Sequence, residues 1–273
     1  MPKDFNVHEW NKKRYLGEAM GTPKAIILAG APGAGKGYVL SGLDLGGLKV
    51  LNVDNAYIDL LKKANVSLDL KNATPQGRSD AAKAMAQANK EFKGKVAATI
   101  EGKESFVLDG TAASIKQTAN LKNELEEAGY DVFMLYVYTD LERSLKQNEA
   151  RFEKSGGKDR SLAPAIVLRT WSDVTSNFKA YEAMFKDNFV SVANTLEDEK
   201  LSDVADIIKK YLDPFRPTGT KPKTDAQKAR SERSKAELNA KVKDLLADDN
   251  VNMIINNSVS KEEAQAKIKQ FLG

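Results

Sequence analysis

The chain of 273 residues contains no cysteine and a single histidine, His8. Without cysteine it has no disulfide framework and no thiolate chemistry, and one histidine cannot build a histidine metal site. We interpret His8 as a surface or packing residue, because it stands outside any cluster of titratable residues. The composition suits a reducing cytoplasm.

Long apolar runs are also missing. No run approaches the roughly 20 residues that span a bilayer, and the first residues lack the apolar core of a secretory signal. The net charge of +4 is too small over this length to demand a nucleic-acid partner. Because 41% of the residues are hydrophobic, the chain can bury a sizeable core. We expect a soluble, cytoplasmic protein with no membrane partner, built as one principal domain plus an appendage.

Glycine is concentrated in one motif, GAPGAGKG, at residues 30–37. An apolar run that is typical of a buried strand, Ala25–Ala29, precedes it, and Tyr38–Leu40 can open a helix. Strand, glycine loop and helix form the context of a phosphate-binding loop, in which backbone N–H groups and a lysine contact a nucleotide. The predicted nucleotide-binding residues are Gly30, Ala31, Pro32, Gly33, Ala34, Gly35, Lys36, Gly37 and Tyr38. A glycine-rich turn without a ligand is the alternative, but spacing, lysine and flanking elements all favour the phosphate loop.

The motif lacks one common feature of phosphate loops. Gly37 stands where a serine or threonine hydroxyl usually contacts Mg²⁺, so the loop itself offers no side-chain ligand.

Two aspartates follow predicted strands. Asp54 comes after the strand 48–53. The stretch 105–111 contains the next strand and its end, and the apolar part of that strand closes on Asp109. Ligands gather at the carboxyl ends of parallel strands, so both carboxylates are expected near the phosphate loop. Asp109 fits the pattern in which a strand-end carboxylate holds Mg²⁺ directly or through water. Asp54 is a site candidate, and its alternative role is to cap a helix that begins near Ala56 or Tyr57.

A cation-rich stretch surrounds the turn Ser155–Gly157. Its members are Arg143, Lys146, Arg151, Lys154, Lys158, Arg160 and Arg169. Basic residues around a Gly-Gly hinge suit a lid that closes over phosphates. A solvated basic face remains the alternative for any single member.

The remaining pattern predicts alternating helices and strands. We expect a loop over 65–79 that is placed to hold a second substrate, and a helix capped by Ser79 and Asp80. The other expected elements are a helix over 114–128, strands over 130–138 and 189–192, a helix over 141–154, a long helix from Pro164 to Phe185, and a core helix over 201–212.

The composition changes after residue 212. Three prolines fall within the stretch from Pro214 to Pro222, both ends included, which indicates a linker. From Arg216 to Lys243 the sequence contains nine basic residues and three acidic ones. Two helices are expected, near 225–247 and 259–272. Such a tail can bind a protein or nucleic acid, although a solvated helical pair is the default interpretation.

Taken together, residues 24 to about 212 resemble the P-loop kinase group that includes zeta toxins, polynucleotide kinases and adenylate kinases. The loop resembles that of adenylate kinase, with Tyr38 in place of its threonine. The later residues resemble zeta toxin relatives and kinase-like proteins of large tailed phages. If a phage encodes this chain, the expected location is the cytoplasm of the host cell. This second likeness rests on Ser144 to Asn148, Arg151, Gly156–Gly157, Arg160, Pro164 and Trp171.

The resemblance implies an α/β fold, a three-layer sandwich around a five-stranded parallel sheet in the order 2-3-1-4-5. The resemblance covers a kinase-like domain over 24–212. Outside it, composition and pattern predict a peripheral segment over 1–23, a linker over 213–224 and a helical tail over 225–273. Lys36 would bind the β- and γ-phosphates of ATP, Asp54 would orient or deprotonate the acceptor hydroxyl, and Arg151 and Arg160 would clamp the transferring phosphate.

The expected function is ATP- and Mg²⁺-dependent phosphoryl transfer to a hydroxyl of a small molecule, nucleotide or polynucleotide end. The partners would be a nucleotide and an unidentified acceptor. A nucleotide-binding scaffold that docks through its basic tail is the alternative.

Overall fold

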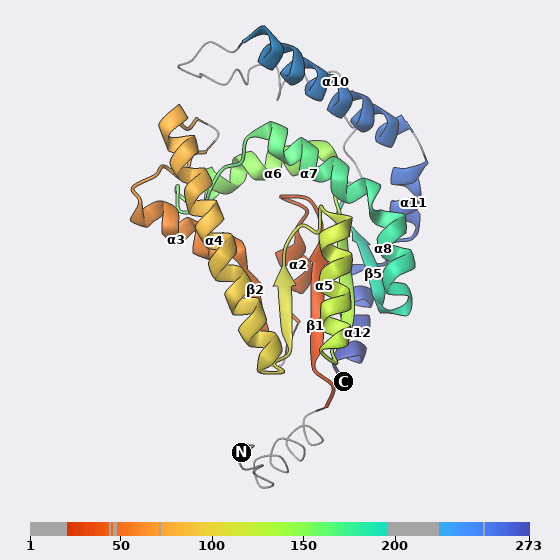
Figure 1. Cartoon of the computed structure of the whole chain (residues 1–273). Helices are drawn as coiled ribbons and strands as arrows, with labels where there is room; N and C mark the ends of the chain where they lie inside the picture. Colours follow the sequence, from red (N-terminus) through yellow and green to blue (C-terminus); the bar gives the residue numbers. More distant parts are fainter. Residues whose placement is uncertain (1–20, 44, 46–47, 71, 196–223, 248) are drawn as a thin grey trace, which may run out of the picture.

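A parallel sheet of five strands lies at the centre of the computed structural model, which describes residues 21–43, 45, 48–70, 72–195, 224–247 and 249–273 (Figure 1). The strands are β1 (Lys24–Ala29), β2 (Lys49–Asn52), β3 (Phe106–Asp109), β4 (Asp131–Tyr138) and β5 (Phe189–Ala193). Their order is β2-β3-β1-β4-β5, and every neighbouring pair is parallel. The expected order 2-3-1-4-5 and the α/β class are therefore confirmed.

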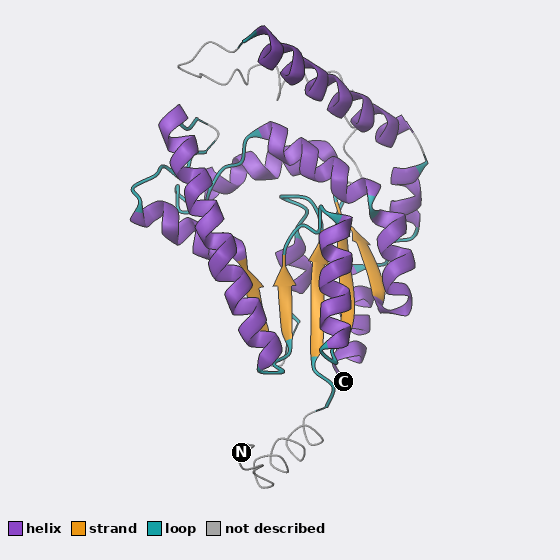
Figure 2. Cartoon of the chain, in the orientation of Figure 1, coloured by secondary structure: helices purple, strands orange, loops and turns teal. Residues whose placement is uncertain are grey.

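Helices flank the sheet on both sides (Figure 2). They are α2 (Lys36–Leu40), α3 (Val53–Lys63), α4 (Pro75–Glu101), α5 (Ile115–Glu127), α6 (Leu141–Lys154), α7 (Pro164–Ser176), α8 (Phe178–Phe185), the 3₁₀ helix η1 (Lys186–Asn188), α10 (Asp225–Ala247), α11 (Asn250–Asn256) and α12 (Lys261–Leu272).

Three predicted helix boundaries were wrong. Helix α3 begins at Val53 rather than near Ala56. Helix α4 begins at Pro75, and the Thr74 side chain caps it by accepting a hydrogen bond from Gly77 N at 3.0 Å, so Ser79 and Asp80 lie inside the helix. The expected long helix from Pro164 is interrupted at Asn177, between α7 and α8.

Alternate residues of the strands face two separate cores, as the pleat of a strand requires. Ala25 and Ile27 belong to a cluster that α5, α7 and α8 cover, whereas Ile26 and Leu28 belong to a second cluster that α2 and α12 cover. These two helical layers and the sheet between them form the three-layer sandwich.

The last helix of the chain is part of this sandwich. Ala264 and Ile268 of α12 are fully buried in the same cluster as Phe133 of β4 and Val192 of β5. The Phe271 ring lies 5.0 Å from the Phe133 ring, centroid to centroid. The interpretation of the tail as a solvated helical pair is therefore wrong for α12, and a third helix, α11, lies between the two that were expected.

Truncation of a buried side chain in α12 should destabilise the whole protein. We expect Ile268→Ala to lower the free energy of unfolding by about 2–4 kcal/mol, because it removes apolar contacts and leaves a cavity. Urea denaturation measures the change. Lys267→Ala, an exposed neighbour in the same helix, is the matched control and should change stability little. Equal stability of both variants would contradict the packing of α12 on the sheet.

Some expectations fall outside the described residues. These are most of the peripheral segment 1–23, the helix over 201–212 and most of the linker over 213–224. Within the described ranges, no helix is both long and apolar enough to cross a membrane.

Candidate active site

The glycine motif forms a tight loop between β1 and α2. Gly33 and Gly35 adopt φ angles of 77° and 84°, in the left-handed region that favours glycine. Both positions are also crowded: a Cβ atom on Gly33 would lie 3.0 Å from the Ser144 carbonyl oxygen. The motif therefore needs glycine at these two positions both for backbone conformation and for space.

Lys36 is the first residue of α2 and lies at the base of the loop. Its Nζ donates hydrogen bonds to the carbonyl oxygens of Gly30, at 2.9 Å, and Ala31, at 3.2 Å. Burial lowers the pKa of Lys36, and the carboxylates of Asp109 and Asp54 oppose that shift. The ammonium thus contacts the loop carbonyls, and Lys36 lines the same cavity as both predicted carboxylates.

Asp54 lies in the first turn of α3. The side chain that caps this helix is that of Asn52, whose Oδ1 accepts a hydrogen bond from Asp54 N at 2.6 Å. The alternative role of Asp54 as a helix cap is thus taken by Asn52. This leaves the Asp54 carboxylate to form an ion pair with Arg160, with 2.6 Å between Oδ1 and Nη2.

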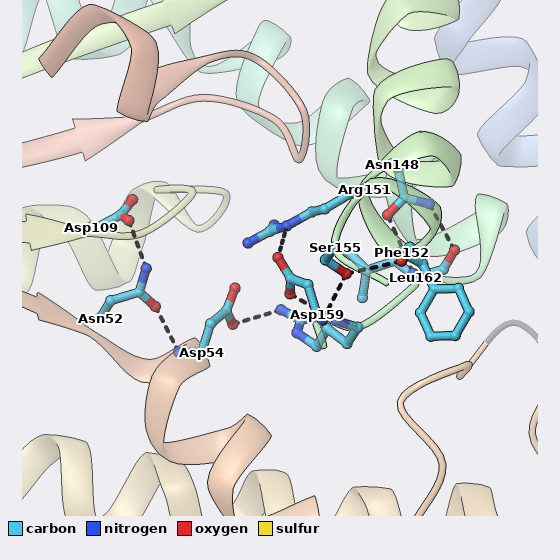
Figure 3. A network of polar contacts seen from close by, with 10 residues as sticks. Asn52, Asp54, Asp109, Asn148, Arg151, Phe152, Ser155, Asp159 and Leu162 are labelled. Carbon is cyan, nitrogen blue, oxygen red and sulfur yellow. Dashed lines mark hydrogen bonds and ion pairs between the residues drawn. The ribbon is translucent and has the colours of Figure 1, made fainter. Parts of the chain in front are cut away.

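Asp109 ends β3 and is the register partner of Asn52 on β2. Because the two strands are parallel neighbours, both side chains emerge at the same edge of the sheet. The Asn52 amide Nδ2 donates to Asp109 Oδ2 at 2.6 Å, so one asparagine joins both predicted carboxylate positions (Figure 3).

Two arginines of the predicted lid are paired with carboxylates. Arg160 contacts Asp54 and also lies over the Tyr57 ring, 5.4 Å from its centroid. Its Nε is buried and has no hydrogen-bond partner among the described residues. Arg151 pairs through Nε with Asp159 of the lid itself. The lid therefore contacts the first turn of α3 through Arg160. Arg151 pairs with Asp159 within the lid (Figure 3).

The base of the lid is held by a side-chain amide. Asn148 of α6 donates to the Leu162 carbonyl at 2.9 Å and accepts from Leu162 N at 3.2 Å. Between these residues, Gly156 and Gly157 adopt φ angles of 61° and 75°. The glycine turn is thus closed by a paired contact between its two flanks.

One cavity of about 1200 Å³ brings these groups together. Its lining includes ten of the predicted site residues: Pro32, Gly33, Ala34, Gly35, Lys36, Gly37, Asp54, Asp109, Arg151 and Arg160. Gly30 and Ala31 contact Lys36 from behind the loop and are not part of the lining. Tyr38 also lies outside the lining. This residue is 62% exposed, and Lys261 Nζ of α12 lies 3.9 Å from the centroid of its ring.

Of the seven cations predicted around the lid, three line the cavity: Arg151, Lys154 and Arg160. Lys146 instead forms an ion pair with Glu142 on the same helix, with 3.3 Å between Nζ and Oε1. Three of the seven cations therefore lie where they can meet a phosphate in the cavity, and closure of a lid stays a prediction.

The cavity lining also includes residues that sequence reasoning missed. Tyr57, Arg78 and Met85 come from α3 and α4, and Ile166 and Thr170 come from α7. Arg78 fell within the expected loop 65–79, but it lies in the first turn of α4. No local motif marks these residues, because they reach one cavity from three helices that are separate in the sequence.

The described residues contain no group of three or more His, Cys, Asp or Glu side chains that could hold a metal ion. Mg²⁺ bound to a nucleotide needs only one or two carboxylates, because phosphates and water supply the remaining ligands. Asp109 alone at the strand end matches that donor set, so the residues present fit a nucleotide-bound Mg²⁺.

Among solved structures, the AvrRxo1-ORF1:-ORF2 complex has a TM-score of 0.51 and 18% identity, covering 93% of this chain and 81% of that chain. This likeness concerns the fold. A structure from the PezAT toxin-antitoxin system of Streptococcus pneumoniae has a TM-score of 0.43 and 16% identity, covering 88% of this chain and 98% of that chain. Comparison with curated proteins finds no match.

The sequence itself matches the family model described as Zeta toxin over residues 8–204, which is more than half of the chain. The match includes the phosphate loop, Asp54, Asp109 and the lid. This chain belongs to the zeta toxin family.

Proposed function

We propose that the protein is a P-loop phosphotransferase that moves the γ-phosphoryl group of ATP to a hydroxyl of an organic acceptor. The observation that carries the proposal is that Lys36, Asp54, Asp109 and Arg160 line one cavity beside the phosphate loop. Membership of the zeta toxin family and a fold shared with the AvrRxo1-ORF1:-ORF2 complex support it.

Lys36 and the N–H groups of the loop would bind the β- and γ-phosphates. A loop at a helix start offers converging N–H donors, and the ammonium adds a full positive charge. The charges of Asp109 and Asp54, which oppose the lowering of the Lys36 pKa by burial, support a role for the ammonium near both carboxylates.

Asp54 would take the proton of the acceptor hydroxyl. As the acceptor oxygen bonds to the γ-phosphorus, the bond to the bridging oxygen breaks, ADP leaves, and the hydroxyl proton passes to the carboxylate. In the structure Arg160 occupies this carboxylate. The γ-phosphate would draw Arg160 away, so that Arg160 neutralises the transferring group while Asp54 becomes available as a base.

Asp109 would hold Mg²⁺ on the nucleotide, and the hydrogen bond from Asn52 would fix the orientation of its carboxylate. Bound Mg²⁺ would neutralise charge on the β- and γ-phosphates. Arg151, now paired with Asp159, is the second cation proposed for the transferring phosphate.

A cytoplasmic location and a phage origin stay predictions.

A label-transfer screen tests the proposal. Wild-type protein is incubated with γ-labelled ATP, Mg²⁺ and panels of sugars, nucleotides and 5′-hydroxyl oligonucleotides. We expect a labelled product in one panel. ATP binding without a labelled organic product in any panel would instead support a nucleotide-binding scaffold.

The scaffold is a second candidate because Gly37 supplies no hydroxyl for Mg²⁺. It would use the basic tail for docking. However, the basic excess within α10 is only two: Lys228, Arg230, Arg233, Lys235, Lys241 and Lys243 against Asp225, Glu232, Glu237 and Asp244. Lys241 also pairs with Asp173 of α7, with 2.8 Å between Nζ and Oδ1.

The docking role needs a test that preserves the fold. Deletion of residues 213–273 would remove α12 from the core. Charge reversal of the exposed Arg230, Arg233 and Lys235 leaves those contacts intact. If the tail docks on nucleic acid, the triple variant should lose salt-dependent binding to DNA or RNA. Unchanged binding of nucleic acid by the triple variant would exclude that docking role.

The division of the chain by a linker at 213–224 stays a proposal.

A further inference from the structure

Two peptide groups of the phosphate loop are held from outside by side chains of other elements. Ser144 of α6 donates its hydroxyl to the Pro32 carbonyl at 2.6 Å. Asn194, which directly follows β5, donates its amide Nδ2 to the Ala34 carbonyl at 2.9 Å. Both contacts span more than 100 residues of sequence.

The orientation of these carbonyls decides which way the next N–H groups point. In a trans peptide, the C=O of one residue and the N–H of the next point in opposite directions. Contacts that hold the Pro32 and Ala34 carbonyls therefore fix the N–H directions of Gly33 and Gly35. Because glycine permits rotation of the flanking peptides, these two positions need an external restraint if their N–H groups are to stay directed at a ligand.

We propose that Ser144 and Asn194 are positioning residues, which keep the loop in the conformation that binds phosphate. The inference rests on the proposed nucleotide binding. Asn194 is not among the residues that line the cavity, so its effect on a nucleotide passes through the loop.

Asn194 is itself held in place. Its backbone N–H donates to the Tyr138 carbonyl at 2.9 Å, and its carbonyl accepts from Thr139 Oγ1 at 3.0 Å. The Thr139 carbonyl in turn accepts from the Trp171 indole of α7 at 2.8 Å. Because these contacts fix the backbone of Asn194, its side chain starts from a defined position, and less conformational freedom is lost when it restrains the glycine loop.

The fit at the loop is close. A Cβ atom on Gly35 would lie 2.3 Å from Asn194 Nδ2, and one on Gly33 would lie 3.0 Å from the Ser144 carbonyl oxygen. Ser144 is fully buried. Both supports thus touch the loop at its glycines, which accounts for the lack of side chains there.

Calorimetric titration with ADP and Mg²⁺ tests the inference. We expect Asn194→Ala and Ser144→Ala each to weaken ADP binding by about tenfold, equal to about 1.4 kcal/mol. Asn194→Asp should weaken it further, because a carboxylate cannot donate to the Ala34 carbonyl and repels the bound phosphates.

Asn188→Ala is the matched control. Asn188 donates its side-chain amide to the Val132 carbonyl at 3.1 Å. This is a similar contact near the start of β4, at the amino ends of the strands and away from the phosphate loop. It should lower the melting temperature without changing ADP affinity. Wild-type affinity for ADP in the folded Asn194 and Ser144 variants would overturn the inference.

Amide hydrogen exchange separates this inference from the proposed function. In the free protein, exchange over residues 30–37 should be about fivefold faster in Asn194→Ala and Ser144→Ala than in wild type or Asn188→Ala. Unchanged exchange would overturn the positioning role, even if the wild type binds no nucleotide. Failure of the wild type to bind ADP would refute only the proposed function.

Discussion

Asp54→Asn is expected to slow phosphoryl transfer within a single turnover by about 10²- to 10⁴-fold, with little change in ATP affinity. The substitution keeps the size of the side chain but removes its capacity to take a proton, and general base catalysis contributes about this much. Asn52, which caps α3, is untouched, so the helix should remain intact. Rapid-quench measurement with γ-labelled ATP and the acceptor found by screening gives the rate.

The control for Asp54 is Asp59→Asn, an exposed aspartate on the same helix. This variant removes the same charge from α3 outside the cavity and should transfer phosphate at the wild-type rate. An Asp54→Asn enzyme as fast as wild type would remove Asp54 from the mechanism. Equal slowing of both variants would indicate a general effect of charge instead.

Lys36→Met is expected to weaken ATP binding by about 10- to 100-fold. It removes a charged donor to phosphate, and hydrogen bonds to charged groups contribute about 1.5–3 kcal/mol. Methionine keeps an unbranched side chain of similar length. Because burial lowers the pKa of Lys36, the folded protein disfavours the charged form, and the variant should melt no lower than wild type.

Calorimetry with ATP and a thermal melt of the same samples measure both effects. Lys62→Met, at an exposed position on α3, is the control and should bind ATP like wild type. Tight ATP binding by Lys36→Met would show that the nucleotide does not use the phosphate loop.

The central features of the fold followed from local sequence. Apolar runs marked the strands, and the helix over 141–154 was predicted with its observed ends. The glycine motif determined a loop between β1 and α2, because its backbone conformation requires glycine. Asp54 and Asp109 were expected near this loop because parallel strands end at one edge of the sheet, and both line the cavity.

The pairing of site residues was not predictable in the same way. Arg160 reaches Asp54 across 106 residues, while Arg151 pairs with Asp159 only eight residues away. Both arginines belong to the same basic stretch, and only packing of the lid against α3 distinguishes them. Arg78 and Met85 likewise reach the cavity through the packing of α4 on α3.

The place of α12 could not be predicted either. Its buried face consists mainly of Ala264 and Ile268, which is a weak apolar signal in a charged segment. Asn194 was missed because a single asparagine after a strand carries no motif. Its importance comes from contacts with Ala34 and Thr139, which the chain order does not reveal.

A crystal structure with Mg²⁺ and a non-hydrolysable ATP analogue tests the central claim most directly. We predict β- and γ-phosphate oxygens within about 3 Å of Lys36 Nζ and of the loop N–H groups. Arg160 should have left Asp54 for the γ-phosphate, with the Asp54 carboxylate facing the cavity. A nucleotide bound elsewhere, or a loop without phosphate at saturating analogue, would contradict the assignment of this cavity as a phosphotransferase site.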